Sequence, residues 1–154
     1  MTEPSIIRDY NKEYQDSATM SGRYSHEFDD VLRKYMMRTF SSFISNDATN
    51  ALELGCYKGT FTEILANHFD DLTVIEAADE LIEFSRGRVG KKVKFIHSTF
   101  ESAELDEQFD SIFLIHTLEH IDDPVLVLKK IKKWLSDKGK LFVAVPNANA
   151  ASRQ

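Results

Sequence analysis

The chain of 154 residues is very poor in cysteine, because Cys56 is the only one. No disulfide can form within the chain, and nothing in it indicates an oxidising compartment. The first residues contain no apolar segment of the signal-peptide kind, and no run of about 18 apolar residues occurs that would cross a membrane. These absences favour a cytoplasmic location.

The chain also lacks an excess of basic residues. It has 19 Lys and Arg against 25 Asp and Glu, which gives a formal net charge of -6 and a pI near 5.4. This balance argues against nucleic acid and against an anionic membrane surface as partners. The content of 42% hydrophobic and 29% charged residues is ordinary for a globular protein and allows one core. We therefore expect a single domain.

Apolar residues recur with helical and strand spacing across residues 25–147. Polar, irregular sequence at residues 1–24 predicts an N-terminal arm, and residues 148–154 form a tail. Helix signals alternate with short apolar segments: Ser25 as an N-cap, a capping box at 60–63, Asp79 as a cap and Asp-Pro at 123–124. We expect strands at 51–54, 72–76, 93–97, 111–115 and 140–145, with Gly139 breaking the chain before the last. Such alternation predicts parallel βαβ units with helices on both faces of a sheet.

The sharpest local pattern is a glycine turn between the first strand and the next helix. Gly55 and Gly59 let the backbone turn tightly and approach a ligand closely. Glu76 ends the second strand, 21 positions after Gly55. A carboxylate at about this distance accepts hydrogen bonds from a ribose diol, and ligands of such sheets bind outside the carboxyl ends of the strands. The pattern predicts a pocket for an adenosine-type ligand.

The glycine spacing decides between two kinds of adenosine ligand. In the dinucleotide fingerprint G-x-G-x-x-G, the second and third glycine positions hold Tyr57 and Thr60 here. A pyrophosphate needs a close backbone approach at that second glycine, which Tyr57 hinders. A nicotinamide-dependent oxidoreductase is therefore the less favoured alternative.

Glu53, Gly55 and Gly59 resemble motif I of class I S-adenosylmethionine-dependent methyltransferases, whose pattern is E/D-x-G-x-G-x-G, with Tyr57 replacing the central glycine. Residues 93–101 look like the third strand and following loop of that family. The Leu-Glu-His-Ile-Asp-Asp-Pro run at 118–124 is similar to the segment after strand four in its small-molecule members. The resemblance covers roughly residues 50–147. It implies a Rossmann-like, doubly wound, mostly parallel α/β sheet, S-adenosylmethionine as cofactor, and methyl transfer to an O, N or C nucleophile of a small molecule.

The resemblance also implies the site residues. It places the methionine end of the cofactor at the turn, the ribose at the end of strand two and the adenine in the loop after strand three. Thr99 stands where the family often has an Asp for the adenine amino group, and Tyr24 closes the pocket from the arm. The cofactor-binding set is Glu53, Gly55, Cys56, Tyr57, Gly59, Glu76, Ala77, Thr99, Phe100, His116 and Tyr24.

His116 is the one candidate catalytic residue, because it follows strand four and an imidazole can accept a proton from a hydroxyl or amine. A hydrogen bond to the loop backbone is an alternative role, and His120 is interpreted as structural. His116, Glu119 and His120 have no further ligands to complete a metal site, so no metal is expected. Cys56 is interpreted as a small filler with no base to activate it. A non-catalytic S-adenosylmethionine-binding module, or a truncated inactive fragment, remains an alternative function.

The family sheet has seven strands, and five are apparent here, so we expect the fold to be truncated after the fifth strand. That strand carries Leu141, Phe142, Val143 and Val145 and would form an exposed apolar edge. Long apolar edges favour pairing with another chain. A homodimer through this edge is the expected assembly.

Overall fold

The computed structural model describes residues 9–12, 15 and 26–147. Within them, one sheet of five parallel strands has the order β3-β2-β1-β4-β5. No helix in these ranges is long and apolar enough to cross a membrane. The strands are β1 (Asn50–Leu54), β2 (Asp71–Glu76), β3 (Val93–His97), β4 (Phe109–Ile115) and β5 (Leu135–Ala144). The helices are α2 (His26–Ser41), α3 (Thr60–Ala66), α4 (Asp79–Val89) and α5 (Pro124–Trp134), with single 3-10 turns η1 (Gly90–Lys92) and η2 (Leu118–His120).

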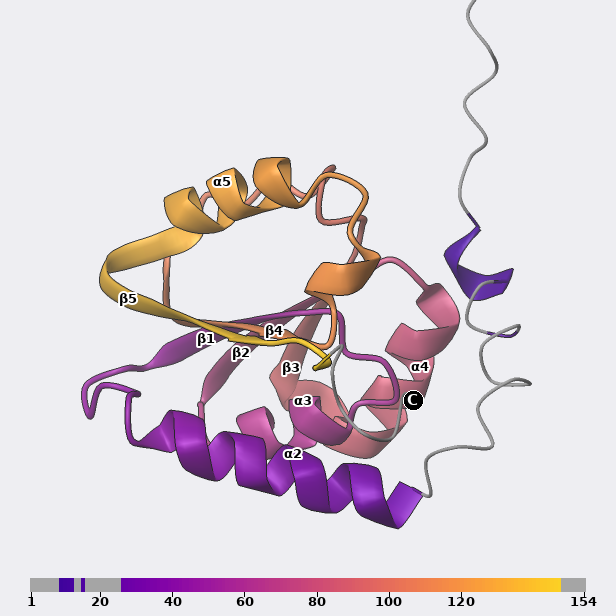
Figure 1. Ribbon diagram of the computed structural model, residues 1–154, viewed down its shortest axis with the longest axis horizontal. Helices are drawn as coiled ribbons and strands as arrows, with labels where there is room; N and C mark the ends of the chain where they lie inside the picture. The colour runs from indigo at the N-terminus through magenta and orange to yellow at the C-terminus, as the bar shows by residue number, and fades with distance from the viewer. Residues whose placement is uncertain (1–8, 13–14, 16–25, 148–154) are drawn as a thin grey trace, which may run out of the picture.

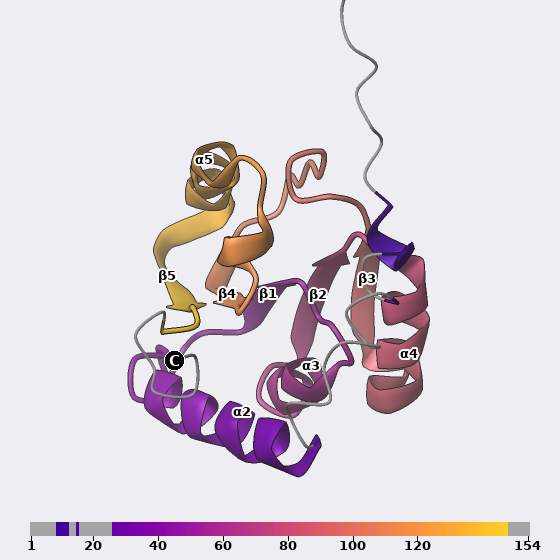
Figure 2. The same ribbon diagram turned by 45° about the vertical axis from the view of Figure 1, so that its right-hand side comes forward.

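Helices cover both faces of the sheet (Figures 1 and 2). α2, α3 and α4 lie on one face, and α5 lies on the other. The predicted parallel, doubly wound α/β fold is therefore confirmed. The strand order runs outward in one direction from β1 and in the other from β4. This reversal creates a crevice at the carboxyl ends of β1 and β4, which positions the site described below.

The side chains of β4 alternate between two apolar cores. Phe113 and Ile115 belong to the core under α2 and α3, whereas Ile112 and Leu114 belong to the core under α5. Because both faces are covered, the strand is apolar at nearly every position. Phe113 stacks on Phe142 of β5, with their ring centroids 4.8 Å apart. The aromatic core therefore couples the centre of the sheet to its edge strand.

The fifth strand begins earlier than the sequence predicts. β5 starts at Leu135, directly after α5, and contains Gly139, so the predicted chain break before 140–145 is wrong. Its pairing with β4 is irregular between Phe109 and Ser111. A Cβ at Gly139 would lie 2.7 Å from the Phe109 carbonyl oxygen. A close backbone approach, and not a turn, accounts for this glycine.

The helix starts follow different local chemistry. Asp123 caps α5 as predicted, because its carboxylate accepts the N–H of Leu126 at 2.9 Å. The predicted capping box at 60–63 is wrong: the N-cap of α3 is Gly59, which has a φ of 75° and offers no side-chain cap. Asp79 is the first residue of α4 and not its cap. Backbone conformation and packing set these two starts, so side-chain patterns alone misplace the caps.

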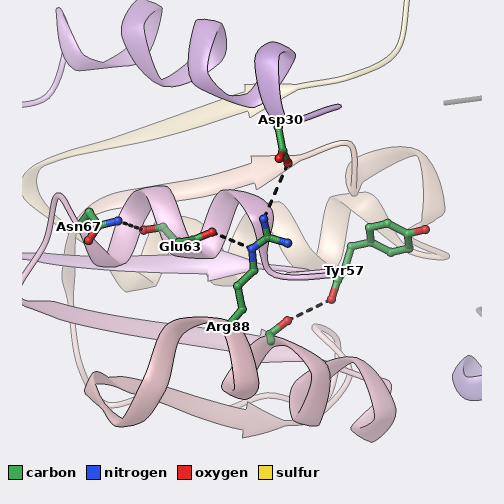
Figure 3. A network of polar contacts seen from close by, with 6 residues as sticks. Asp30, Tyr57, Glu63, Asn67 and Arg88 are labelled. Carbon is green, nitrogen blue, oxygen red and sulfur yellow. Dashed lines mark hydrogen bonds and ion pairs between the residues drawn. The ribbon is translucent and has the colours of Figure 1, made fainter. Parts of the chain in front are cut away.

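An ion-pair network joins three helices on the face opposite α5 (Figure 3). Arg88 of α4 donates from Nε to Glu63 Oε2 of α3 at 2.7 Å, and its Nη2 lies 3.9 Å from Asp30 Oδ1 of α2. The three side chains are 33%, 45% and 43% exposed respectively, so solvent screens both pairs. Each pair is expected to contribute less than about 1 kcal/mol. The network orients α4 against α3 more than it stabilises the fold.

The turn before α3 should tolerate no side chain at Gly59. A Cβ there would lie 2.9 Å from Ser85 Oγ and 3.1 Å from Ser85 Cα, at a backbone φ of 75°. We expect Gly59→Ala to lower the free energy of unfolding by about 1–3 kcal/mol in urea denaturation. Gly87→Ala is the matched control on α4, because its Cβ would meet nothing within 4 Å. Helix propensity predicts a gain of up to about 1 kcal/mol there, and equal stabilities of the two variants would refute the close packing of the turn on α4.

Candidate functional site

A cavity of about 250 Å³ opens at the carboxyl ends of β1, β2 and β4, where the strand order reverses. This is the usual ligand position in open α/β sheets. Its walls come from the turn after β1, the end of β2, the loops after β3 and β4, and helix α2. The lining residues are Tyr10, Arg33, Glu53, Gly55, Cys56, Tyr57, Lys58, Thr60, Phe61, Glu76, Ala77, Leu81, Phe100, Ile115, His116, Thr117 and His120.

The turn after β1 has a left-handed backbone at three positions. The φ angles are 83° at Gly55, 46° at Tyr57 and 75° at Gly59. Glycine adopts such angles without steric cost, whereas another L-residue is disfavoured by about 1–2 kcal/mol. Tyr57 occupies the central glycine position of the motif I pattern. The left-handed backbone at this position explains why the motif has a glycine there. In this chain Tyr57 adopts the same glycine-like conformation.

Gly55 allows two other loops to close on this turn. A Cβ at Gly55 would lie 2.9 Å from Thr117 Oγ1, in the loop after β4, and 3.6 Å from the ring atom Cζ of Phe100, in the loop after β3. The backbone N–H of Gly55 donates to the carbonyl oxygen of Ile75 at 2.9 Å. The turn is thus held against β2 while its exposed side faces the cavity.

Glu76 organises the floor of the site through backbone hydrogen bonds. Its Oε2 accepts the N–H of Cys56 at 3.0 Å, and its Oε1 accepts the N–H groups of Ala77 and Ala78 at 2.8 and 3.1 Å. The side chain is buried but contributes to the cavity wall. Oε1 already accepts two N–H groups, whereas Oε2 accepts one, beside a weak contact from the Cys56 thiol at 3.7 Å, and keeps an acceptor position. Glu76 can therefore accept hydrogen bonds from ligand hydroxyls while it holds the turn.

Glu53 has a different environment in the same cavity. It is 1% exposed, and its Oε2 has no hydrogen-bond partner among the described residues. Burial raises the pKa of Glu53 to about 8; the Thr62 hydroxyl and the charge of Arg33 act in the opposite direction but more weakly. Thr62 Oγ1 is also without a partner in the described structure, so it lies near Glu53 but outside hydrogen-bonding geometry. A buried acid with an unpaired oxygen in a cavity wall is suited to a cationic ligand group.

Arg33 brings an opposite charge to the same cavity. It extends from α2, lines the cavity together with Glu53, and its charge partly offsets the rise that burial causes in the pKa of that acid. An acid and a guanidinium from separate elements thus lie in one wall. This pair is complementary to the ammonium and carboxylate of an amino acid.

His116 and His120 lie in the wall at the end of β4. His116 has a φ of 54°, and its backbone N–H donates to the carbonyl oxygen of Ala144 in β5 at 2.8 Å. Both imidazoles contribute to the cavity. The sequence interpretation favoured a structural role for His120, and the structure places it in the cavity wall with His116. Two groups able to accept protons therefore border the site.

Cys56 is poorly suited to act as a nucleophile. Burial, together with the negative charges of Glu76 and Glu53, raises the pKa of its thiol far above the ordinary range. Its Sγ accepts a contact from Ser85 Oγ at 3.3 Å. These observations agree with the interpretation of Cys56 as a small filler in the turn.

The structure gathers most of the expected site residues around one cavity. Gly59 and Thr99 are not among the residues that line it. Gly59 instead packs on α4, and Thr99 closes the local turn after β3 by accepting the N–H of Ser102 at 3.2 Å through Oγ1. Tyr24 lies outside the described residues. The expected residues that do line the cavity are Glu53, Gly55, Cys56, Tyr57, Glu76, Ala77, Phe100 and His116.

Sequence reasoning missed several polar residues of the cavity, among them Arg33 and Tyr10. Arg33 lies four positions before Met37, which the structure buries, so it extends from the packed side of α2; apolar periodicity alone does not single out this side. Tyr10 belongs to the expected arm, and its place in the wall follows from contacts remote in sequence. One is the hydrogen bond from Asn11 Nδ2 to Asp79 Oδ1 at 2.6 Å. No local pattern predicts such a contact.

No metal centre is visible in the part of the chain that the structure describes. Within residues 9–12, 15 and 26–147, no three His, Cys, Asp or Glu side chains gather where they could hold a metal ion.

Comparisons with known proteins place this geometry in context. Residues 24–154 match the family model described as a methyltransferase domain. The (S)-coclaurine N-methyltransferase of Papaver somniferum is 32% identical over 103 residues, which cover 63% of this chain and 29% of that protein. Nodulation protein S of Bradyrhizobium diazoefficiens is 32% identical over 106 residues, which cover 68% of this chain and 51% of that protein. The chain thus spans between about a third and a half of the length of these relatives.

Solved structures show the same fold. The N-methyltransferase NodS from Bradyrhizobium japonicum WM9, in complex with S-adenosyl-L-homocysteine, superposes with a TM-score of 0.72 at 23% identity and covers 86% of this chain and 71% of NodS. The plantazolicin methyltransferase BpumL, in complex with the same compound, gives 0.75 at 19% identity and covers 86% of this chain and 55% of BpumL. With the family match covering most of its length, the chain belongs to the methyltransferase domain family.

Proposed function

We propose that this chain binds S-adenosylmethionine and takes part in methyl transfer to a small-molecule acceptor. One observation carries the proposal: a single cavity at the switch point holds an acid–guanidinium pair, Glu53 and Arg33, and the ribose-type acceptor Glu76. The Glu53–Arg33 pair suits the amino-acid end of the cofactor, and Glu76 suits its nucleoside end. Family membership supports the same ligand, as do the complexes of NodS and BpumL with S-adenosyl-L-homocysteine.

The residues present fit this cofactor group by group. The unpaired Oε2 of Glu53 would accept from the methionine ammonium, and Arg33 would bind the methionine carboxylate. Glu76 would accept the ribose hydroxyls, and the ring of Phe100 would contact the adenine. Gly55 lines the same cavity, and without a side chain its backbone would approach the ligand closely.

The protein has mainly a positioning role in the proposed reaction. S-adenosylmethionine supplies a methyl group on a positively charged sulfur, so alignment of the acceptor accounts for much of the catalysis. His116, at the end of β4, would accept a proton from an acceptor hydroxyl or amine. The proposed acceptor atom is an oxygen, nitrogen or carbon nucleophile, and the curated relatives include both N- and O-methyltransferases.

A non-catalytic cofactor-binding module is the second candidate function. It is favoured by Tyr57, which fills the central glycine position with a strained residue in the cavity wall. Methyl transfer from labelled S-adenosylmethionine to any small acceptor would exclude it. A cytoplasmic location and the absence of nucleic-acid or membrane partners remain predictions from the cysteine content and net charge.

Calorimetric titration of the folded chain with S-adenosyl-L-homocysteine tests the proposal directly. We expect saturable micromolar binding, because charges of both signs and the ribose acceptor face one cavity, and no binding of NADH under the same conditions. Glu76→Ala should weaken the affinity at least about tenfold, since a ribose acceptor and the anchor of the turn are lost together.

The matched control is Glu83→Ala, which removes a glutamate of α4 whose side chain is 71% exposed and lies outside the cavity. It should leave the affinity unchanged. If the wild-type chain is folded and takes up no S-adenosyl-L-homocysteine, the proposed function is wrong; if Glu76→Ala binds like the control, only the ribose assignment fails.

Stability should depend on pH through Glu53. Its pKa is about 8 in the folded chain against 4.5 ordinarily, so the folded state holds the proton more tightly. The stability that protonated Glu53 contributes is therefore fully present below pH 4.5 and is lost as the pH rises through about 8. We expect a loss of about 3–5 kcal/mol over this window in urea unfolding, largely absent in Glu53→Gln. Parallel pH profiles of wild type and Glu53→Gln would contradict the buried, protonated state; Glu83→Gln serves as the exposed control.

We also propose that the free edge of β5 pairs with a second copy of the chain. Among the described residues β5 is an edge strand; Val143 within it is 39% exposed, and Val145, just after its end, is 53% exposed. Sedimentation equilibrium should show a monomer–dimer equilibrium that shifts to monomer in Val143→Lys, because a charged side chain disfavours edge pairing. A wild-type chain that stays monomeric at about 100 μM removes the proposal.

A further inference from the structure

The strained conformation of Tyr57 requires an explanation in this structure. Its φ of 46° lies in the left-handed region, which costs a residue with a Cβ free energy that glycine avoids. Such conformations persist where the surrounding contacts determine them. A restraint on the Tyr57 backbone must therefore come from a neighbouring element.

Ser85 of α4 supplies a contact of this kind. It is completely buried, and its Oγ donates to the carbonyl oxygen of Tyr57 at 3.1 Å. The same hydroxyl lies 3.3 Å from Cys56 Sγ, a weaker acceptor. Figure 3 shows the Tyr57 carbonyl directed toward α4 while the phenol ring points away from it. The hydrogen bond thus acts on the peptide group that leaves the strained residue.

Two features bring Ser85 close enough to make this bond. Gly59 has no side chain, and a Cβ there would lie within 3.0 Å of Ser85 Oγ and Cβ. Arg88, one helical turn after Ser85 on the same side of α4, pairs with Glu63 of α3 at 2.7 Å. α4 is therefore held against the start of α3 where Ser85 meets the turn.

The restraint reaches the cavity through the two peptide groups on either side of the Cys56–Tyr57 segment. Glu76 holds the N–H of Cys56, and Ser85 holds the carbonyl of Tyr57. Tyr57 remains 42% exposed and lines the cavity, and Lys58 Nζ lies 5.4 Å from the centroid of its ring. An anchor at each end fixes the segment that faces the ligand space.

We propose that Ser85 is a positioning residue that replaces the missing central glycine of the turn: by binding the Tyr57 carbonyl it holds Tyr57 in the left-handed conformation and keeps the cofactor-binding turn in its open shape. Ser85 itself does not line the cavity. The effect on ligand affinity rests on the proposed binding of S-adenosylmethionine, whereas the restraint on the backbone does not.

A double-mutant cycle tests the proposal, with the affinity for S-adenosyl-L-homocysteine and the free energy of unfolding as its two readouts. Ser85→Ala should weaken binding about fivefold in the wild-type background, the effect of one net hydrogen bond. In the Tyr57→Gly background the same change should weaken binding less than about twofold, because glycine needs no restraint. The Tyr57→Ala background removes the ring but keeps the Cβ, so there the loss should remain about fivefold.

Ser111→Ala is the control for a merely structural effect, because it removes another buried serine, in the part of β4 remote from the turn. Its effect on stability and binding should be the same in the Tyr57 and Tyr57→Gly backgrounds. Equal losses from Ser85→Ala in all three backgrounds, or no loss in any, would overturn the proposal. If the wild-type chain binds no S-adenosyl-L-homocysteine, the proposed function fails. The free energies of unfolding then still test the restraint on Tyr57. Only the loss from Ser85→Ala, and not that from Ser111→Ala, should depend on whether residue 57 has a Cβ.

Discussion

The carboxylate of Glu76 is the constraint on which the site depends. Its two oxygens hold the N–H groups of Cys56, Ala77 and Ala78, so one buried side chain joins the turn after β1 to the start of α4. The parallel register pairs β1 with β2 up to Ile75 and makes this contact possible. Charge-assisted hydrogen bonds to backbone donors are among the stronger polar interactions in proteins. The turn therefore takes its shape from the strand beside it as much as from its own glycines.

Two carboxyl groups in one small cavity must be kept from repelling each other. Glu76 accepts hydrogen bonds from three backbone donors, whereas burial without a full set of partners raises the pKa of Glu53 to about 8. The cavity thus holds one acid that backbone N–H groups anchor and another acid whose charge depends on its occupant. A cationic group beside Glu53 would favour the carboxylate, with Arg33 limiting the charge imbalance. This difference gives the cavity two chemically distinct ends.

The sequence predicts the framework better than the side chains that reach the cavity from remote elements. Strand positions follow from apolar segments buried on both faces, as in β4, and Glu76 follows from its distance to the glycine turn, because parallel pairing brings those strand ends together. The cap at 60–63 was misplaced, since a left-handed glycine and its packing on α4 set the start of α3. The position of Arg33 depends on how α2 crosses the sheet, which periodicity does not specify. Local sequence patterns thus predict the helices and strands, whereas tertiary contacts decide which remote side chains reach the cavity.

The glycines of the turn allow a left-handed backbone and close packing. A residue other than glycine can take the same position when neighbouring contacts offset the cost. At Gly55 no substitute is available, because a Cβ would enter the space of Thr117 Oγ1. At Tyr57 the Cβ is tolerated and only the conformation is costly, so a hydrogen bond from a neighbouring helix can offset the cost. When another residue replaces a glycine of such a motif, the contacts around that residue therefore decide whether the turn keeps its shape. In this chain that neighbour is Ser85, and Gly59 is the residue whose missing side chain lets it approach.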